Sequence, residues 1–235
     1  MRTLFGGCAC VALVLGGMNP STASATTLFD LINSSGSISV GTLTFSGFSY
    51  LGTGDMPNSA NVTVSAYTDP VTMDVGLKFE GSFFDSPTSG GSDALIDFQV
   101  AENDNTHLVT GATLAGDPSV TPLGATANGV VSVTETFLPT DPSLTLTIFA
   151  SAQNGVAGPT QSSDSGSFAT GHSLVFVQKD VLSFNADPNG SGTPGLTFIT
   201  QTFHQGNNIP EPSTVIMLGT AMVGMALHQW RRRRS

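Results

Sequence analysis

The sequence predicts an all-β protein, an antiparallel two-sheet sandwich of jelly-roll type with one short helix at the start of its body. Apolar residues alternate with Ser, Thr and Gly in successive runs, turn-forming residues separate the runs, and no amphipathic pattern of helical length interrupts them. Alternation with period two gives each strand one apolar face and one polar face. Two sheets of such strands bury their apolar faces by packing against each other.

The helix is expected at the beginning of the body. The segment TTLFDLIN, residues 26–33, places Leu28, Leu31 and Ile32 at helical spacing. The Ser-Ser-Gly that follows ends this pattern, because small and flexible residues favour a helix terminus.

Eight to ten short strands are expected after this helix. The period changes to two in SISVGTLTFSGFSY, residues 37–50, and the same alternation returns along the body. The apolar positions of the later runs are Val62, Val64 and Ala66; Val71, Met73, Val75, Leu77 and Phe79; Ala94, Ile96, Phe98 and Val100; Val131, Val133 and Phe137; Leu144, Leu146 and Ile148; Leu174 to Val177; Leu196 and Phe198.

Turn-forming residues separate these runs at intervals that suit antiparallel hairpins. Asp69-Pro70 and Asp187-Pro188-Asn189-Gly190 are two examples, and we interpret the second as a turn because it lacks the third ligand of a calcium loop. The longest stretch without a pattern is QNGVAGPTQSSDSGSFAT, residues 153–170. We expect it to form a mobile surface loop.

The N-terminal segment has the pattern of a secretory signal peptide, residues 1–25. An apolar run over residues 4–15 is followed by STASA, in which Ala23 and Ala25 supply the small residues that a signal peptidase reads. Thr26 is then the expected first mature residue. Cys8 and Cys10 both lie in the removed segment, so the mature body is expected to have no disulfide and no cysteine ligand.

The charge of the body excludes one class of partner. Residues 26–209 contain two lysines, no arginine and sixteen of the seventeen acidic residues, a formal net charge of −14 with neutral histidines. Such a surface repels phosphate, so nucleic acid is not an expected partner. The composition is compatible with calcium, with neutral polysaccharide, or with solubility outside the cell.

A structural calcium site is one hypothesis for the acidic residues. In DALIDFQVAEND, residues 93–104, Asp93 and Asp97 are expected on the polar strand face, and Glu102 and Asp104 at the start of the following loop. Carboxylate oxygens are suitable calcium ligands if these four converge. The alternative interpretation is a solvated acidic face, and no other cofactor is expected.

Patterns of catalytic residues are weak, and we predict that the body is not an enzyme. Ser165 and His172 lie in a stretch already rich in serine and glycine, without the strand-to-helix elbow that exposes a nucleophile. His107, His172 and His204 form no pair at i, i+2 or i+4, so solvated histidines are favoured over a zinc site. Among the sixteen acids, nothing selects the two carboxylates that glycoside hydrolysis requires.

Threonine pairs raise an ice-binding alternative. Such arrays can bind ice or flat polymers, but scattered pairs do not make a regular repeat, and threonine suits an exposed strand face. The pairs are Thr42 and Thr44, Thr134 and Thr136, and Thr145 and Thr147.

The C-terminal segment, residues 210–235, has three parts in order. Pro210, Glu211 and Pro212 form an extended box, because proline cannot continue a helix or a central strand. Residues 213–230 are largely apolar, and eighteen residues of helix extend about 27 Å, close to the roughly 30 Å of a bilayer core. The arginine cluster that follows is expected to stay in the cytoplasm by the positive-inside rule. It consists of Arg231, Arg232, Arg233 and Arg234.

This arrangement resembles the PEP-CTERM sorting signal of Gram-negative bacteria. The resemblance implies recognition of Pro210, Glu211 and Pro212 by an exosortase, a membrane-embedded protease or transpeptidase, with the arginine cluster as stop-transfer anchor. The start of the body, LFDLINSSGSISVGTLTFSGFSY, more loosely resembles other bodies with this tail. The family is associated with biofilms and exopolysaccharide.

These observations predict a body over residues 26–204, a linker over 205–209 and the sorting signal over 210–235. We expect an exported protein, anchored briefly in the inner membrane with its body in the periplasm. After processing by exosortase it becomes a non-catalytic surface or extracellular-matrix protein. The alternative is a carbohydrate-binding module for exopolysaccharide. An exposed aromatic row would favour this alternative, whereas burial of Phe45, Phe79 and Phe98 would not.

Overall fold

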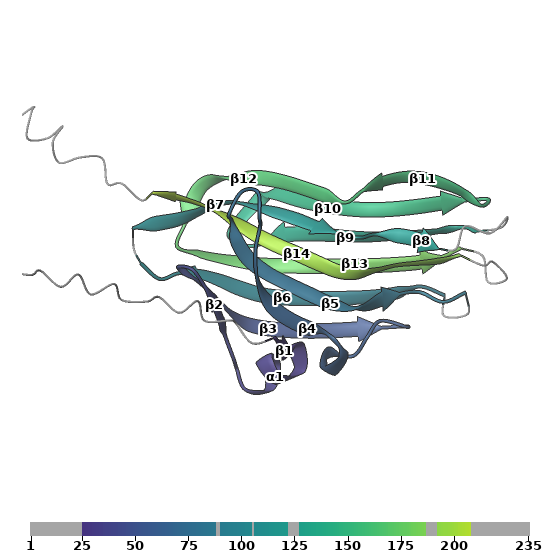
Figure 1. Cartoon of the computed structure of the whole chain (residues 1–235), viewed down its shortest axis with the longest axis horizontal. Helices are drawn as coiled ribbons and strands as arrows, with labels where there is room; N and C mark the ends of the chain where they lie inside the picture. The colour runs from purple at the N-terminus through teal and green to yellow at the C-terminus, as the bar shows by residue number, and fades with distance from the viewer. Residues whose placement is uncertain (1–24, 88–89, 105, 122–126, 187–191, 208–235) are drawn as a thin grey trace, which may run out of the picture.

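Two seven-stranded antiparallel sheets face each other in the part of the chain that the structure describes, and their strands run along the long axis of the molecule (Figure 1). The structure is a computed structural model that describes residues 25–87, 90–104, 106–121, 127–186 and 192–207. The prediction of an all-β, two-sheet antiparallel protein is confirmed.

The first sheet, sheet A, has the order β1-β4-β5-β14-β7-β12, with β8 paired to β14. The second, sheet B, has the order β11-β10-β9-β13-β6-β3-β2. The strands of sheet A are β1 (Thr26–Thr27), β4 (Thr63–Thr68), β5 (Val75–Phe84), β7 (His107–Gly116), β8 (Ser119–Thr121), β12 (Ser163–His172) and β14 (Thr193–Asn207). Those of sheet B are β2 (Ile38–Val40), β3 (Leu43–Thr53), β6 (Ser92–Glu102), β9 (Gly129–Phe137), β10 (Asp141–Gln153), β11 (Val156–Gln161) and β13 (Leu174–Asn185).

The predicted short helix is confirmed as α1 (Leu28–Asn33), which packs against β3 and the 3₁₀ turn η1 (Ser59–Asn61). Thr27 caps its first turn: its side chain accepts from the Asp30 backbone N–H at 3.1 Å and donates to the Asp30 carboxylate at 2.7 Å. This cap satisfies the Asp30 N–H group, which has no partner within the helix. Leu28 and Leu31 are buried and join the core.

Phenylalanines from both sheets meet in the core around Phe98 of β6. The Phe98 ring lies 5.7 Å from Phe79 of sheet A and 5.9 Å from Phe48 of its own sheet. Phe45 is 6.3 Å from Phe98 and 5.9 Å from Phe203 of β14. Offset and tilted pairs at these separations add to the free energy gained by burying the rings.

The prediction of one strand from Val71 to Phe79 was wrong. The strand β5 begins at Val75, and Val71 and Met73 before it are exposed. The Asp69 carboxylate accepts from the Val71 and Thr72 backbone N–H groups at 2.7 and 2.9 Å and holds this segment in a turn. A short local hydrogen bond therefore outweighs the alternation.

The predicted mobile loop over residues 153–170 was also wrong, because β11 and most of β12 occupy it. Both are edge strands, paired on one side to β10 and β7 respectively. Nearly all of their side chains are exposed or half-buried. An edge strand can be held by backbone hydrogen bonds alone, so its sequence need not show apolar alternation. Such edge strands, with the short β1, β2 and β8, explain why the eight to ten expected strands were too few.

Strand pairing continues past residue 204, the predicted end of the body. In β14, residues predicted to begin a linker, Gln205, Gly206 and Asn207, pair with β7. The predicted signal peptide up to Ser24, the turn at residues 187–190 and the sorting segment lie outside the described residues. Within the described residues, no helix combines the length and the apolar character needed to cross a bilayer.

Gly76 provides a test of the sheet packing. A Cβ at this buried position on β5 would lie 1.7 Å from the Gln201 carbonyl oxygen of β14, and overpacking against a central strand is costly. We predict that Gly76→Ala lowers the free energy of unfolding by about 3 kcal/mol or more, measured by denaturant titration. Gly81→Ala on the same strand is the control, because its Cβ would meet side chains at 3.3 Å or beyond. A change at Gly81 as large as that at Gly76 would contradict this account.

Candidate functional site

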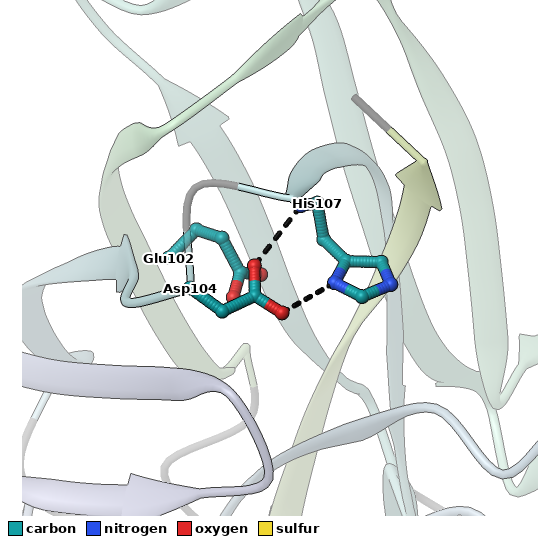
Figure 2. A group of neighbouring side chains, drawn as sticks. All are labelled: Glu102, Asp104 and His107. Carbon is teal, nitrogen blue, oxygen red and sulfur yellow. Dashed lines mark hydrogen bonds and ion pairs between the residues drawn. The ribbon is translucent and has the colours of Figure 1, made fainter. Parts of the chain in front are cut away.

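Three side chains with metal-binding chemistry gather at one end of the sandwich. Glu102 is the last residue of β6, His107 is the first of β7, and Asp104 lies in the turn between them. One potential ligand atom from each lies within 4.8 Å of the others. Figure 2 shows the two carboxylates facing each other with the imidazole beside Asp104.

Hydrogen bonds to Asp104 shape this turn. Its Oδ1 accepts from the backbone N–H groups of Thr106 and His107 at 2.8 and 3.0 Å, and its Oδ2 lies 2.6 Å from His107 Nδ1 (Figure 2). Desolvation acts to raise the pKa of Asp104. The hydrogen bonds from Thr106 and His107 prevail and hold the pKa well below its usual range. The carboxylate is therefore charged at neutral pH and available to a cation.

Glu102 occupies a buried position, in phase with the core-facing residues of β6. Its carboxylate accepts from the Asn103 backbone N–H at 3.2 Å and from the side-chain amide of Gln205 on β14. The same amide group of Gln205 donates to Thr42 Oγ1. Glu102 and His107 are thus both held by the last described residues of β14, where Gln205 contacts Glu102 and Asn207 pairs with His107.

The donor set consists of one imidazole and two carboxylates. Zinc accepts both nitrogen and carboxylate oxygen, whereas calcium takes oxygen ligands almost exclusively. These residues also have a structural role that needs no metal, because the contact between Asp104 and His107 closes the β6–β7 turn. The acid–histidine spacing of i, i+3 in Asp104-Asn105-Thr106-His107 was the sequence signal for this contact. Our prediction considered only pairs of histidines and therefore missed it.

The four carboxylates considered for calcium do not converge. Asp93 and Asp97 lie on the outer face of β6, opposite to Glu102. Asp97 and Glu102 are five positions apart, about 17 Å along an extended strand. Asp97 accepts from Ser49 Oγ at 2.8 Å and from the amide of Gln178 at 3.1 Å.

Asp93 lies beside another carboxylate on this outer face. Partial desolvation, a hydrogen bond to Asp93 and the nearby charge of Asp93 raise the pKa of Asp180. Only Glu102 and Asp104 of the four predicted ligands come together, and they do so with His107.

His172 and His204 are also half-buried, and each contacts a neighbouring side chain rather than being fully solvated. His204 Nε2 lies 2.9 Å from Thr113 Oγ1, and the His172 ring packs edge-on against Phe168 at 5.6 Å. Ser165 lies on β12 and pairs with Thr113, whereas His172 pairs with Val109. The structure therefore places the three described histidines, His107, His172 and His204, in different environments.

A shallow pocket of about 220 Å³ lies on the outer face of sheet B. A bulge in β3 between Ser46 and Ser49, with Gly47 at a φ of 66°, opens the sheet surface at this point. A left-handed backbone at a bulge favours glycine because it has no Cβ. The lining residues are Gly47, Asp97, Phe98, Gln99, Leu138, Phe176, Val177 and Gln178.

Comparison with known proteins identifies the C-terminal segment. A family model described as the PEP-CTERM protein-sorting motif matches residues 208–233. No curated protein matches the chain. One solved structure, Trichoderma harzianum endoglucanase 3 from family GH12, is 10% identical and covers 66% of this chain and 98% of that chain. Its TM-score of 0.21 is too low to carry an argument about this protein.

We predict that Zn²⁺ raises the melting temperature of the body more than Ca²⁺ does, because the Glu102–Asp104–His107 group offers a nitrogen donor and few oxygen donors. Thermal unfolding in each ion and in chelator measures the difference. His107→Ala should abolish the zinc increment, and His172→Ala should retain it. Equal melting curves in all three solutions would leave the group as an ion pair that closes the turn.

Proposed function

Since the chain ends in this sorting motif and is thus a PEP-CTERM protein, we propose that it is a non-catalytic component of the cell surface or extracellular matrix. The motif implies export, a membrane-anchored precursor and processing by exosortase. The match over residues 208–233 is the observation that carries the proposal. We further propose that the body is held in the periplasm before processing and takes part in an exopolysaccharide-rich biofilm afterwards.

Charge and length account for the anchoring step. An apolar span of about 27 Å at 1.5 Å per residue nearly matches the hydrocarbon core. The four terminal arginines cannot cross it cheaply. Export would therefore halt with Pro210, Glu211 and Pro212 at the outer boundary of the membrane. The prolines keep this box out of the helix and extended, a suitable conformation for a protease.

The body has features that suit exposure outside the cell. Its fold is complete without disulfides, since residues 26–209 contain no cysteine. The edge strands β11 and β12 are rich in glycine, serine and threonine. β11 also contains Pro159 and pairs with β10 across a bulge, and β12 contains Asp164. Proline, bulges and charges on edge strands reduce sheet-to-sheet association.

The pocket on the outer face of sheet B favours a second function, binding of exopolysaccharide. Phe176 offers part of an aromatic face, and Gln99, Gln178 and Asp97 offer polar groups beside it. Sugars present both apolar faces and hydroxyls, so such a mixture is suitable for them. Phe45, Phe79 and Phe98 are buried, which counts against the aromatic row considered from the sequence. We therefore place this candidate second.

Replacing Pro210, Glu211 and Pro212 together by alanine should leave an anchored, uncleaved precursor in the cell of origin, because the extended recognition box is lost. The intact mass of the wild-type exported protein is the accompanying measurement, and it should lack Trp230 and the arginine cluster. Replacing Ser213 by alanine is the control, and processing should continue. An exported wild-type protein that retains Trp230 would show that the tail is a permanent anchor.

If exopolysaccharide binds at the outer-face pocket, Phe176→Ser should reduce binding at least tenfold, because the apolar wall of the pocket is lost. Binding of the purified body to the producing cell's own polysaccharide and to a glycan array measures this. Phe184→Ser is matched, since Phe184 lies on the outward-facing side of the same strand, outside the pocket residues, and is 40% exposed. Equal binding by both variants would place any glycan site elsewhere.

A further inference from the structure

Three polar side chains meet inside the apolar core, between the two sheets. Lys179 of β13 and Glu135 of β9 are register partners in sheet B, and Gln201 of β14 lies across from them in sheet A. All three are completely buried. The Lys179 Nζ donates to Glu135 Oε2 and to Gln201 Oε1, so one amine contacts a carboxylate and a carboxamide together.

The surroundings of this cluster are apolar. The Lys179 Nζ lies 5.7 Å from the centre of the Phe98 ring. Glu135 Oε1 is buried and has no hydrogen-bond partner among the described residues. A buried carboxylate with an unpartnered oxygen is poorly stabilised as an anion.

Burial favours the neutral forms of the pair. Desolvation raises the pKa of Glu135 and lowers the pKa of Lys179, although each charge opposes the shift of the other. A proton that moves from Lys179 to Glu135 therefore relieves the cost of two buried charges. The result is a neutral amine, a nucleophile, held against a carboxamide.

We propose that Lys179 and Gln201 join in an intramolecular isopeptide bond, with Glu135 as the proton carrier. Three observations support this: an amine, a carboxamide and a carboxyl group in mutual contact, complete exclusion from solvent, and their positions on facing sheets. The Gln201 Cδ is one bond from the oxygen that Lys179 contacts, so the amine lies beside the carbonyl group that it would attack. This proposal is independent of the sorting motif.

The reaction balances without any co-reactant. The ammonium of Lys179 first gives a proton to the Glu135 carboxylate. The neutral Nζ then attacks Gln201 Cδ, a C–N bond forms and the carbonyl electron pair moves to Oε1. Glu135 donates its proton to the Gln201 nitrogen and receives another from Nζ. The carbonyl re-forms, the old C–N bond breaks and ammonia leaves. The products are the amide, ammonia and a protonated Glu135.

The fold supplies what makes this reaction feasible. Amide exchange is slow between free groups, but fixed groups can reach effective concentrations of about 10⁵ M or more. The three residues lie far apart in sequence and meet only when the sheets pack. The bond would therefore form after folding and would connect β13 of sheet B covalently to β14 of sheet A. It would provide a cross-link in a body that has no cysteine.

Peptide mapping of the exported wild-type protein tests the proposal. Digestion with a protease that does not cleave at lysine should yield a branched peptide containing Lys179 and Gln201. Its mass should equal the sum of the two linear peptides less one ammonia, and fragmentation should locate the branch. Recovery of only the two linear peptides, with free Lys179 and intact Gln201, would overturn the proposal. No variant is needed for this result.

Variants then test the role of Glu135. Glu135→Gln keeps Lys179 and Gln201 but removes the proton carrier, and it should yield linear peptides. Glu135→Asp should restore part of the branched product. Lys78→Met is the matched control, because Lys78 is the other lysine of the body and pairs with Glu80 at the surface; it should leave the branched peptide unchanged. Full cross-linking in Glu135→Gln would exclude Glu135 as the proton carrier.

Discussion

The core depends on how two buried ionisable groups are accommodated between the sheets. Lys179, Glu135 and Gln201 each occupy a position where the neighbouring core-facing residues of the strand are apolar. Removing one partner of such a pair typically costs about 3–5 kcal/mol, because the other group stays buried without its partner. The strands β9, β13 and β14 must therefore keep their relative register. Phe98 lies beside the same cluster, and Gly76 allows β5 to approach the Gln201 backbone.

The acidity of the body has a structural explanation that composition did not suggest. Several aspartates accept hydrogen bonds from backbone N–H groups in turns and near strand ends. Asp117 accepts from Thr197 and Phe198, and Asp141 accepts from Ser143 and Ala169. Carboxylates can satisfy two N–H groups at once, which suits a fold with many reversals and few regular helices.

This arrangement also links acidity to stability. Hydrogen bonds from Ser143 and Ala169 lower the pKa of Asp141, and those from Thr72 and Val71 lower that of Asp69. A carboxyl group with a depressed folded-state pKa stabilises the fold above its unfolded pKa of about 4. That contribution is lost as the pH falls through the folded-state value. The aspartates thus favour a folded body at neutral pH.

The sequence was sufficient to predict the fold class, because the alternation of apolar and polar residues in the central strands shows which side chains are buried. It predicted α1 and the apolar faces around Phe45, Phe79 and Phe98. It could not reveal edge strands such as β11, which bury few side chains and are held by backbone pairing. The candidate metal group is local in sequence, and the spacing of Asp104 and His107 signalled part of it. The hydrogen bond that holds Glu102 is not local, because its donor Gln205 on β14 lies 103 positions away. No local spacing records such a contact.

The sequence contains a signal of the buried cluster that alternation alone does not explain. Glu135 interrupts the apolar phase between Val133 and Phe137, and Lys179 does the same between Val177 and Val181. A charged residue at a core-facing position is costly to bury unless it has a partner, changes its protonation state or reacts. The sequence could therefore have shown that these two residues are unusual. Only the pairing of β9 with β13 shows that they meet.

The position of β14 relates the body to its sorting signal. This strand lies inside sheet A, between β5 and β7, and it is the last described element before the motif. A force applied through the anchor would load hydrogen bonds on both sides of β14, in contrast to an edge strand that can peel away from one neighbour. Gln201 and Gln205 add side-chain contacts to Lys179 and Glu102 of sheet B. The strand that precedes the anchor is therefore held by both sheets, which suits a precursor that remains folded while its tail is embedded in the membrane.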